Sequence, residues 1–272
     1  MAFDRAPVEL LRTVQKSEMS DSGEPFASIV IPAYNEVHRL EASIRALREY
    51  LGTVRWSHEI ILVVERSGDG TLELARRLTE RHPEFTVIGH DTQRGKGFAV
   101  RSGMLRARGE IAFFMDADLS TPLPEVERFL ARFGSEPPVD VLVGNRRHPH
   151  SAILKRQNFV RRKMGQTFNA VLRAIGGIRL ADTQCGFKAF RREAREAIFS
   201  RQKLDGFAFD VEVLMLAERL GLKVEDLPVQ WSNADGSRVR IVRDSFRMLV
   251  DAFRVRRVVA ATLSRKTVPP LA

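Results

Sequence analysis

Five short apolar runs, separated by four segments with helical spacing, constrain the fold of this chain more than any other feature. The runs cover 27–31, 59–64, 86–88, 111–115 and 139–143. The segments predicted to be helices are 36–51, 71–81, 97–107 and 124–133; in the first of them Leu40, Ile44, Leu47 and Leu51 recur every three or four positions. Strands that alternate with amphipathic helices in this way predict an α/β fold, with a doubly wound, mostly parallel sheet and helices on both faces.

The remainder of the chain is more basic and less regular. Its pattern predicts a helix at 155–174, a loop at 176–188, a helix at 209–220 and a strand-like segment at 224–231. The expected organisation is one α/β domain over 26–239, preceded by an extension over 1–25 and followed by an amphipathic helix and tail over 240–272. This last segment has one apolar arc beside several arginines. It could lie on anionic lipid or pack on the domain, and both alternatives stay open.

Charge and composition narrow the classes of partner. The chain has 44 Lys and Arg against 34 Asp and Glu, a formal net charge of +10, which indicates an anionic partner. Nucleic acid is not expected, because two Trp and two Tyr give no basic stripe interleaved with aromatic side chains. One cysteine excludes an internal disulfide, and no run approaches the ~20 apolar residues of a spanning helix. The charged N-terminal residues do not resemble a signal peptide, so we expect a cytoplasmic protein, soluble or peripheral on the cytoplasmic membrane face.

Polar clusters at 32–36, 65–70 and 116–120 follow predicted strands. Ligands of doubly wound sheets bind outside the carboxyl ends of the strands, so these clusters predict a site at one edge. Asp116 and Asp118 come directly after an apolar strand, where two carboxylates can bind a hard divalent cation that bridges phosphate oxygens. The alternative is a solvated loop in which Ser120 or Thr121 caps the next helix.

Two further segments at the same predicted edge carry polar side chains. Gly95, Lys96 and Gly97 precede a helix, which favours an anion at the helix N-terminus, although an ordinary tight turn explains the pattern equally well. Glu65 could accept hydrogen bonds from a ribose or a base. Asp69, beside Gly70, is better explained by turn chemistry.

The dense polar segment 182–188 offers a general base in Asp182 and a phosphate contact in Lys188. Cys185 has no histidine nearby to activate it, so we expect a buried thiol. Arg146 and Arg147 follow the fifth predicted strand, where they either clamp a phosphate or form a solvated basic patch.

Taken together, these motifs resemble those of the family 2 glycosyltransferases with the GT-A fold. Within that family they are similar to the polyprenyl-phosphate sugar synthases, and most of all to the dolichyl-phosphate β-glucosyltransferases. The motifs are Ile31-Pro-Ala-Tyr-Asn-Glu36, Arg94-Gly-Lys-Gly97, Asp116-Ala-Asp-Leu-Ser120, Asp182-Thr-Gln-Cys-Gly-Phe-Lys188, Phe207-Ala-Phe-Asp-Val-Glu212, Val229-Gln-Trp231 and Gly236-Ser-Arg238. The resemblance covers about residues 27 to 257, so the domain over 26–239 would be a GT-A catalytic domain.

The resemblance implies roles for individual residues. Those expected to bind the donor are Pro32, Tyr34, Glu36, Glu65, Lys96, Asp116, Ala117, Asp118, Ser120 and Arg146. Those expected to meet the acceptor or its phosphate are Arg147, Gln184, Lys188, Asp210 and Arg238. Asp116 and Asp118 would handle the diphosphate and its Mg²⁺ or Mn²⁺, with Asp118 the direct ligand. Asp182 matches an acid proposed as a base, so the expected catalytic residues are Asp182, Asp116 and Asp118.

The implied reaction is an inverting transfer of glucose from UDP-glucose to a polyprenyl phosphate of dolichyl type. Because that acceptor is already ionised, the need for a base is weak, and the alternative role of Asp182 is to orient the acceptor or the sugar. The alternatives are a GDP-mannose donor, a soluble acceptor, or a catalytically silent nucleotide-sugar-binding or membrane-associated scaffold. The oligomeric state is left open, with a homo-oligomer among the alternatives.

Overall fold

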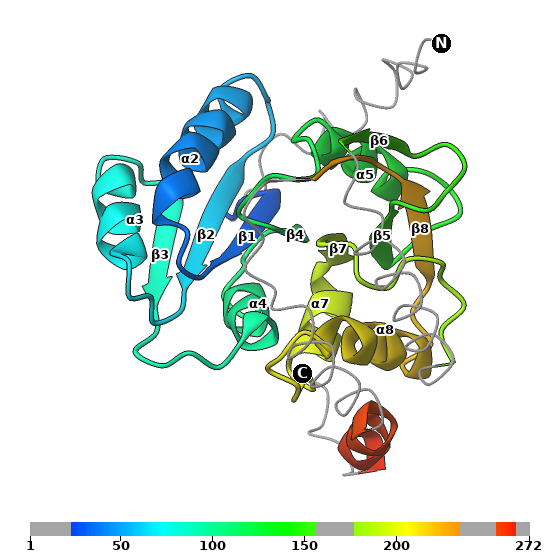
Figure 1. The fold of residues 1–272 in the computed structure, drawn as a ribbon. Helices are drawn as coiled ribbons and strands as arrows, with labels where there is room; N and C mark the ends of the chain where they lie inside the picture. Colours follow the sequence, from blue (N-terminus) through cyan, green and yellow to red (C-terminus); the bar gives the residue numbers. More distant parts are fainter. Residues whose placement is uncertain (1–22, 156–176, 234–253, 265–272) are drawn as a thin grey trace.

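The computed structural model describes residues 23–155, 177–233 and 254–264 (Figure 1). In these residues a seven-stranded sheet has the order β3-β2-β1-β4-β7-β5-β8. The strands are β1 (Ala27–Ala33), β2 (His58–Val64), β3 (Phe85–Gly89), β4 (Ile111–Met115), β5 (Val141–Asn145), β7 (Phe187–Arg191) and β8 (Val224–Pro228). All neighbours run parallel except β7, which is antiparallel to both β4 and β5. The predicted doubly wound, mostly parallel α/β fold is confirmed.

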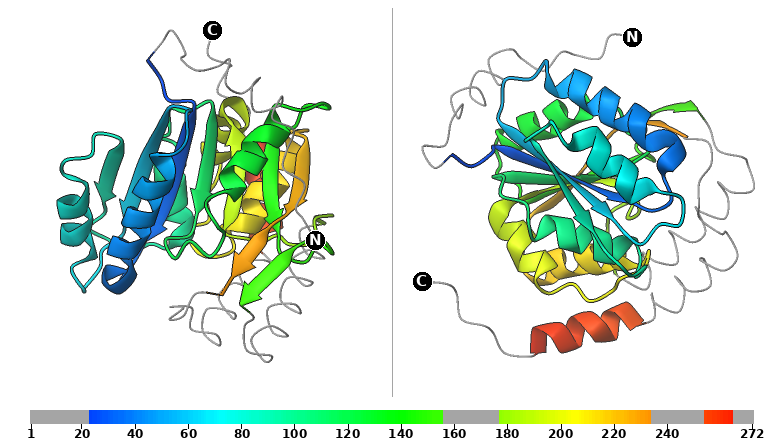
Figure 2. Two further views of the ribbon diagram at one scale, coloured as in Figure 1. Left: turned by 90° about the horizontal axis from the view of Figure 1, so that it is seen from above. Right: turned by 90° about the vertical axis from the view of Figure 1, so that its left-hand side faces the viewer.

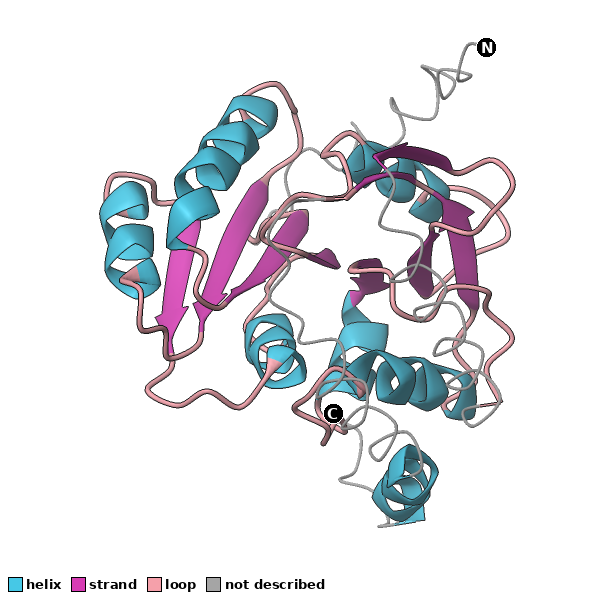
Figure 3. Cartoon of the chain, in the orientation of Figure 1, coloured by secondary structure: helices cyan, strands magenta, loops and turns pink. Residues whose placement is uncertain are grey.

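Helices cover both faces of this sheet, as Figures 2 and 3 show. They are α2 (Val37–Leu51), α3 (Thr71–Thr79), α4 (Lys96–Met104), α5 (Glu125–Phe133), α7 (Arg192–Phe199) and α8 (Phe209–Arg219). Successive side chains of a strand point to opposite faces. Ile29 and Phe113 therefore pack in the core beneath α2, α3 and α5, while Val30 and Phe114 pack in the core beneath α4, α7 and α8.

Residues 254–264 form a further helix on the α8 side of the sheet (Figure 2). Val255 and Val259 are fully or almost fully buried in the same core as Phe114. This part of the predicted C-terminal amphipathic segment thus packs on the domain, which favours that alternative over a purely lipid-bound one for these residues. The parts of the predictions that lie outside the described residues are 156–174 of the predicted helix at 155–174, 1–22 of the extension over 1–25, and 240–253 and 265–272 of the C-terminal segment.

Three predictions about the strands need correction. The first strand continues through Pro32 to Ala33; β4 pairs with β1 only as far as Val30, so the proline removes no ladder bond on that side. The predicted loop at 176–188 gives way to β7 at Phe187. The strand-like segment at 224–231 divides into β8 and β9 (Gln230–Ser232), and β9 leaves the main sheet to pair with β6 (Ala152–Lys155).

Candidate active site

The carboxyl ends of β1, β2, β4 and β5 lie at one edge of the sheet because these strands are parallel. Strand β7 runs the other way, so its amino end lies at this same edge, and Met115 is paired with Phe187. The segment 182–186 is thereby placed beside the residues that follow β4. One antiparallel strand therefore brings together two motifs that are about 70 residues apart in the chain.

Asp116 lies against both this segment and α4. Its Oδ1 is 2.6 Å from Lys96 Nζ, at the first residue of α4. A Cβ placed on Gly186 would lie 2.0 Å from Asp116 Oδ2, so only glycine leaves room for the carboxylate there. Burial alone would lower the pKa of Lys96, but Asp116 and Asp210 outweigh it and raise that pKa. Lys96 therefore stays a cation beside Asp116.

Asp118 shapes the loop that carries it. Its Oδ1 accepts a 3.0 Å hydrogen bond from the Ser120 backbone N–H, and Leu119 between them has a left-handed φ of 50°. Its Oδ2 is 3.8 Å from Arg39 Nη1, a long ion pair. Ala117, between the two acids, packs into the core, and its carbonyl accepts a hydrogen bond from Ser43 Oγ. The Asp116–Asp118 loop is therefore anchored in its middle, with Asp116 beside Lys96 of α4 and Asp118 near Arg39 of α2.

The two acids are suited to a hard cation that is also held by a substrate. The side chains of Asp116 and Asp118 are 38% and 25% exposed, so both can receive a ligand. In the described parts of the chain, no three His, Cys, Asp or Glu side chains gather into a set that could hold a metal ion. A divalent ion here would have to complete its shell with water or substrate oxygens, as Mg²⁺ commonly does.

Glu65, directly after β2, is almost completely buried, and its carboxylate is occupied by the protein. Its Oε1 accepts 2.8 Å hydrogen bonds from the backbone N–H groups of both Arg94 and Gly95, and its Oε2 is 3.1 Å from Gly95 N. The expected contact with base or ribose is not available to it in this arrangement. Asp69, by contrast, accepts bonds from Val37 N and from Thr71, which agrees with the predicted turn role.

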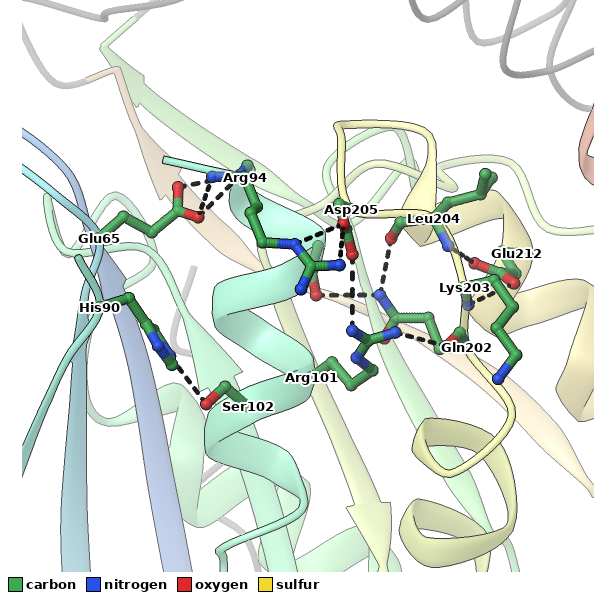
Figure 4. Close-up of polar contacts among 12 residues, drawn as sticks. Glu65, His90, Arg94, Arg101, Ser102, Gln202, Lys203, Leu204, Asp205 and Glu212 are labelled. Atoms are coloured by element: carbon green, nitrogen blue, oxygen red, sulfur yellow. Dashed lines mark hydrogen bonds and ion pairs between the residues drawn. The ribbon is translucent and has the colours of Figure 1, made fainter. Parts of the chain in front are cut away.

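The loop between α7 and α8 holds the other side of the 94–97 segment (Figure 4). Asp205 Oδ2 accepts bonds from both Nε and Nη2 of Arg94, at 2.9 and 2.6 Å. Gln202 Nε2 donates to Gly97 O, and Glu212 accepts from the N–H groups of the two residues that follow Gln202. The sequence reasoning missed Asp205, whose only signal was its place just before the Phe207–Glu212 motif.

Arg146 and Asp182 form a bidentate pair beneath the segment after β5. Arg146 Nε and Nη2 donate to the two Asp182 oxygens at 2.7 and 2.8 Å, and Arg146 N donates to Oδ2 at 3.1 Å. Burial alone would raise the pKa of Asp182, but the guanidinium outweighs it and lowers that pKa to about 2. A carboxylate this acidic and fully buried is a weak proton acceptor, so the geometry favours the orienting role over the base.

Lys188 and Asp210 form a buried ion pair. Lys188 Nζ lies 2.5 Å from Asp210 Oδ1 and 2.7 Å from Cys185 O, and the lysine is fully buried. In this structure both side chains are buried and bonded to each other, and their predicted contact with the acceptor stays a prediction. Burial raises the pKa of Cys185 to about 11, which agrees with the inert buried thiol that was predicted.

The remaining predicted residues are distributed around this edge. Pro32 and Tyr34 lie at and just beyond the end of β1, and Glu36 pairs with Arg39 at 2.6 Å. Ser120 is buried, and its carbonyl accepts a bond from Ser232 of β9. Gln184 is half-buried and Arg147 is exposed, whereas Arg238 lies outside the described residues. β9 also brings Trp231 to the site, where Arg146 lies 5.6 Å from its ring centre.

The paired acids and the lysine thus lie outside the carboxyl ends of a doubly wound sheet, where proteins of this architecture bind their ligands. The sequence matches the family model of glycosyl transferase family 2 over residues 28–199. The chain belongs to that family and is a glycosyltransferase. Of the alternatives drawn from the sequence, a catalytically silent scaffold is therefore set aside.

Curated relatives extend the match beyond the family domain. A dolichyl-phosphate β-glucosyltransferase of Saccharomyces cerevisiae is 33% identical, over 94% of this chain and 82% of the yeast protein. The protein of the same name in Drosophila melanogaster is 32% identical over 90% and 82%, and that of Homo sapiens is 31% identical over 80% and 71%.

Solved structures share the fold at lower identity. Glucosyl-3-phosphoglycerate synthase from Mycobacterium tuberculosis, in complex with UDP, has a TM-score of 0.64 at 18% identity and covers 98% of this chain and 88% of its own. Mannosyl-3-phosphoglycerate synthase from Rubrobacter xylanophilus has a TM-score of 0.66 at 20% identity over 97% and 81%. Among the described residues, none of the helices is both long and apolar enough to span a membrane.

Proposed function

We propose that this glycosyltransferase moves glucose from UDP-glucose to a polyprenyl phosphate of dolichyl type, with inversion at the anomeric carbon. The cluster of Lys96, Asp116 and Asp118 at the carboxyl edge of the sheet carries the proposal. It combines a fixed cation with two accessible carboxylates, the groups that a sugar diphosphate and its counter-ion require. The names of the relatives support the acceptor, and the UDP complexes of proteins with this fold support the donor.

In the proposed reaction an oxygen of the acceptor phosphate attacks the anomeric carbon of glucose. The bond from that carbon to the β-phosphate oxygen breaks, and its electron pair leaves with UDP. Asp116 and Asp118 would hold a Mg²⁺ or Mn²⁺ ion, which when bound neutralises charge on the leaving diphosphate. Lys96 adds a second positive charge from the start of α4. The attacking oxygen is already ionised, so no proton acceptor is needed, in keeping with the low pKa of Asp182.

Transfer of labelled glucose from UDP-glucose to dolichyl phosphate in detergent micelles tests this proposal. Label is expected in the organic phase with Mg²⁺ or Mn²⁺, and about 100-fold less of it with EDTA or in Asp118→Ala, because one charge-stabilising group is worth that much in kcat. Glu110→Ala is the matched control. Glu110 precedes β4 at the opposite end of the strand and is exposed, so this variant should keep full activity.

Two further reactions test the alternative donor and the alternative acceptor. GDP-mannose replaces UDP-glucose in one, and 3-phosphoglycerate replaces dolichyl phosphate in the other. Transfer from GDP-mannose alone would overturn the donor, and transfer to 3-phosphoglycerate alone would overturn the lipid acceptor. Binding of UDP-glucose without transfer to either acceptor would leave the donor standing and reject both acceptors.

A further inference from the structure

The burial of the Glu65 carboxylate decides what this acid can do. The residue is 3% exposed, and both of its oxygens face the backbone of Arg94 and Gly95. The carboxylate could accept further bonds, but its burial leaves a base or a ribose hydroxyl almost no surface from which to donate one. Its contacts instead fix the main chain of the loop that opens α4.

The sheet gives Glu65 a rigid mounting. Its own N–H donates to Ala33 O at the end of β1, and the carbonyl of Val64, immediately before it, accepts a bond from His90 N. Three neighbouring strands therefore set the position of the Glu65 backbone. The loop bonded to its carboxylate therefore takes its position from the β3-β2-β1 part of the sheet.

The opposite side of the same loop is held by Asp205. Its carboxylate binds the Arg94 guanidinium, and its carbonyl accepts a 3.2 Å bond from Phe98 N in the first turn of α4. A Cβ on Gly95 would lie 2.6 Å from this carbonyl, so the two backbones are in close contact. Segment 94–97 is therefore clamped between Glu65 and Asp205.

The residue that this clamp positions is Lys96, next to Gly95 and 2.6 Å from Asp116. We propose that Glu65 is a positioning residue. It sets Lys96 and the first turn of α4 against the diphosphate of a nucleoside diphosphate donor, and it does not select the nucleobase. This inference rests on the proposed function for the presence of a diphosphate. It assigns Glu65 a different role from the base or ribose contact that the sequence motifs suggested.

Calorimetric titration with UDP, GDP and ADP, each in the presence of Mn²⁺, tests the proposal. In Glu65→Gln an amide NH2 group replaces one carboxylate oxygen, so two hydrogen-bond donors face each other at Gly95 N–H and that bond is lost. We expect the affinity for every diphosphate that binds the wild type to fall by a similar factor, about 10-fold, the cost of a lost charged hydrogen bond. A loss confined to one base would show that Glu65 reads the base and would overturn the proposal.

A double-mutant cycle with Lys96→Met tests whether Glu65 acts through the lysine. If it does, Glu65→Gln should change the affinity less than 2-fold in the Lys96→Met background. Equal losses in both backgrounds would overturn the proposal. Asp205→Asn weakens the other side of the clamp and leaves Glu65 unchanged. It should lower the affinity for all the diphosphates by a similar factor. A loss for one base alone, or no loss, would contradict the clamp.

Glu59→Gln is the matched control. Glu59 is a buried acid at the opposite end of β2, and its Oε1 accepts a backbone N–H bond from Arg108, just as Glu65 does from Arg94. This variant should bind the diphosphates with wild-type affinity. If its affinity falls as much as that of Glu65→Gln, the fall in both variants reflects general destabilisation, and the proposal is overturned. Failure of the wild type to bind any diphosphate would reject the proposed function instead, so the two failures are distinguishable.

Discussion

Each acid at the carboxyl edge of the sheet has a different kind of partner, and the partner decides its chemistry. Asp182 faces a guanidinium, Glu65 faces backbone N–H groups, Asp116 faces an ammonium, and Asp118 accepts a bond within its own loop. Asp182 and Glu65 are buried, whereas Asp116 and Asp118 keep exposed oxygens. Four residues of similar type therefore divide into two that hold the framework and two that can receive a ligand.

Gly186→Ala should disable the site while leaving the fold intact. The added Cβ would lie 2.0 Å from Asp116 Oδ2, so the carboxylate must move away from Lys96. Glucosyl transfer is expected to fall about 10- to 100-fold, because displacement by about 1 Å costs that much in enzymes. Gly68→Ala is the control, since a Cβ there meets nothing within 4 Å. Equal activities of the two variants would show that the position of Asp116 does not matter.

Asp182→Asn should reveal the ion pair in the pH dependence of stability. The folded-state pKa is about 2, below the ordinary value of 3.8, so ionised Asp182 stabilises the fold above pH 4, and this contribution is lost as pH falls towards 2. The wild type should exceed the variant by about 2 kcal/mol in free energy of unfolding from pH 5 to 8, and the gap should narrow below pH 4. Urea unfolding at pH 7, 5, 4 and 3 measures it. A gap that widens on acidification would contradict the assignment.

At the scale of elements, the sequence predicted the strands with continuous apolar runs and the strand-like segment that contains β8 and β9. It missed β6 and β7, and it did not separate β9 from β8. β4 is apolar throughout, whereas β7 contains Lys188, whose partner Asp210 lies on α8. Local patterning cannot reveal a lysine neutralised by an acid 22 residues away, so this segment resembled a loop. β6 and β9 are too short, at four and three residues, to show a period.

The site was predicted in the same uneven way. Its residue types and its edge followed from the polar clusters that come after the strands, and Asp116 and Lys96 do meet there. The contacts that bury the Glu65 and Lys188 side chains and bond them to the protein could not be predicted. They depend on where α4 and α8 lie relative to the sheet, which is a tertiary property.

The α7–α8 loop depends on one buried acid of helix α8. Glu212 is fully buried, and its two oxygens accept bonds from Lys203 N and Leu204 N at 2.8 and 2.7 Å. Glu212→Ala would leave both donors unpaired and should lower the free energy of unfolding by about 2–4 kcal/mol. Glu218→Ala on the exposed side of the same helix should change it by less than about 0.5 kcal/mol. Chemical denaturation compares them, and similar losses would reject the role of Glu212.

At the scale of the whole molecule, two cores on opposite faces of the seven-stranded sheet join its strands and the described helices into one unit. Strand β4 contributes Phe113 to one core and Phe114 to the other, and Val255 of the 254–264 helix belongs to the second. The residues that build the site are thus attached to both cores through β4. Both cores therefore fix the position of the site, which a membrane-borne acceptor of the proposed kind would have to approach.

If the acceptor is carried by a membrane, the net charge of +10 predicts that the chain binds to anionic lipid surfaces by electrostatic attraction. Attraction of basic residues to anionic lipid is worth about 1 kcal/mol for each residue near the surface and is screened by salt. The full chain should sediment with vesicles that contain phosphatidylserine at 0.05 M salt and should bind at least about 10-fold more weakly at 0.5 M. Vesicles of phosphatidylcholine alone, the matched control, should bind little at either concentration. Equal binding to both kinds of vesicle would show that apolar contacts attach the enzyme. Absence of binding to either, in a sample active on dolichyl phosphate in micelles, would show that its charge serves the substrates and not the membrane.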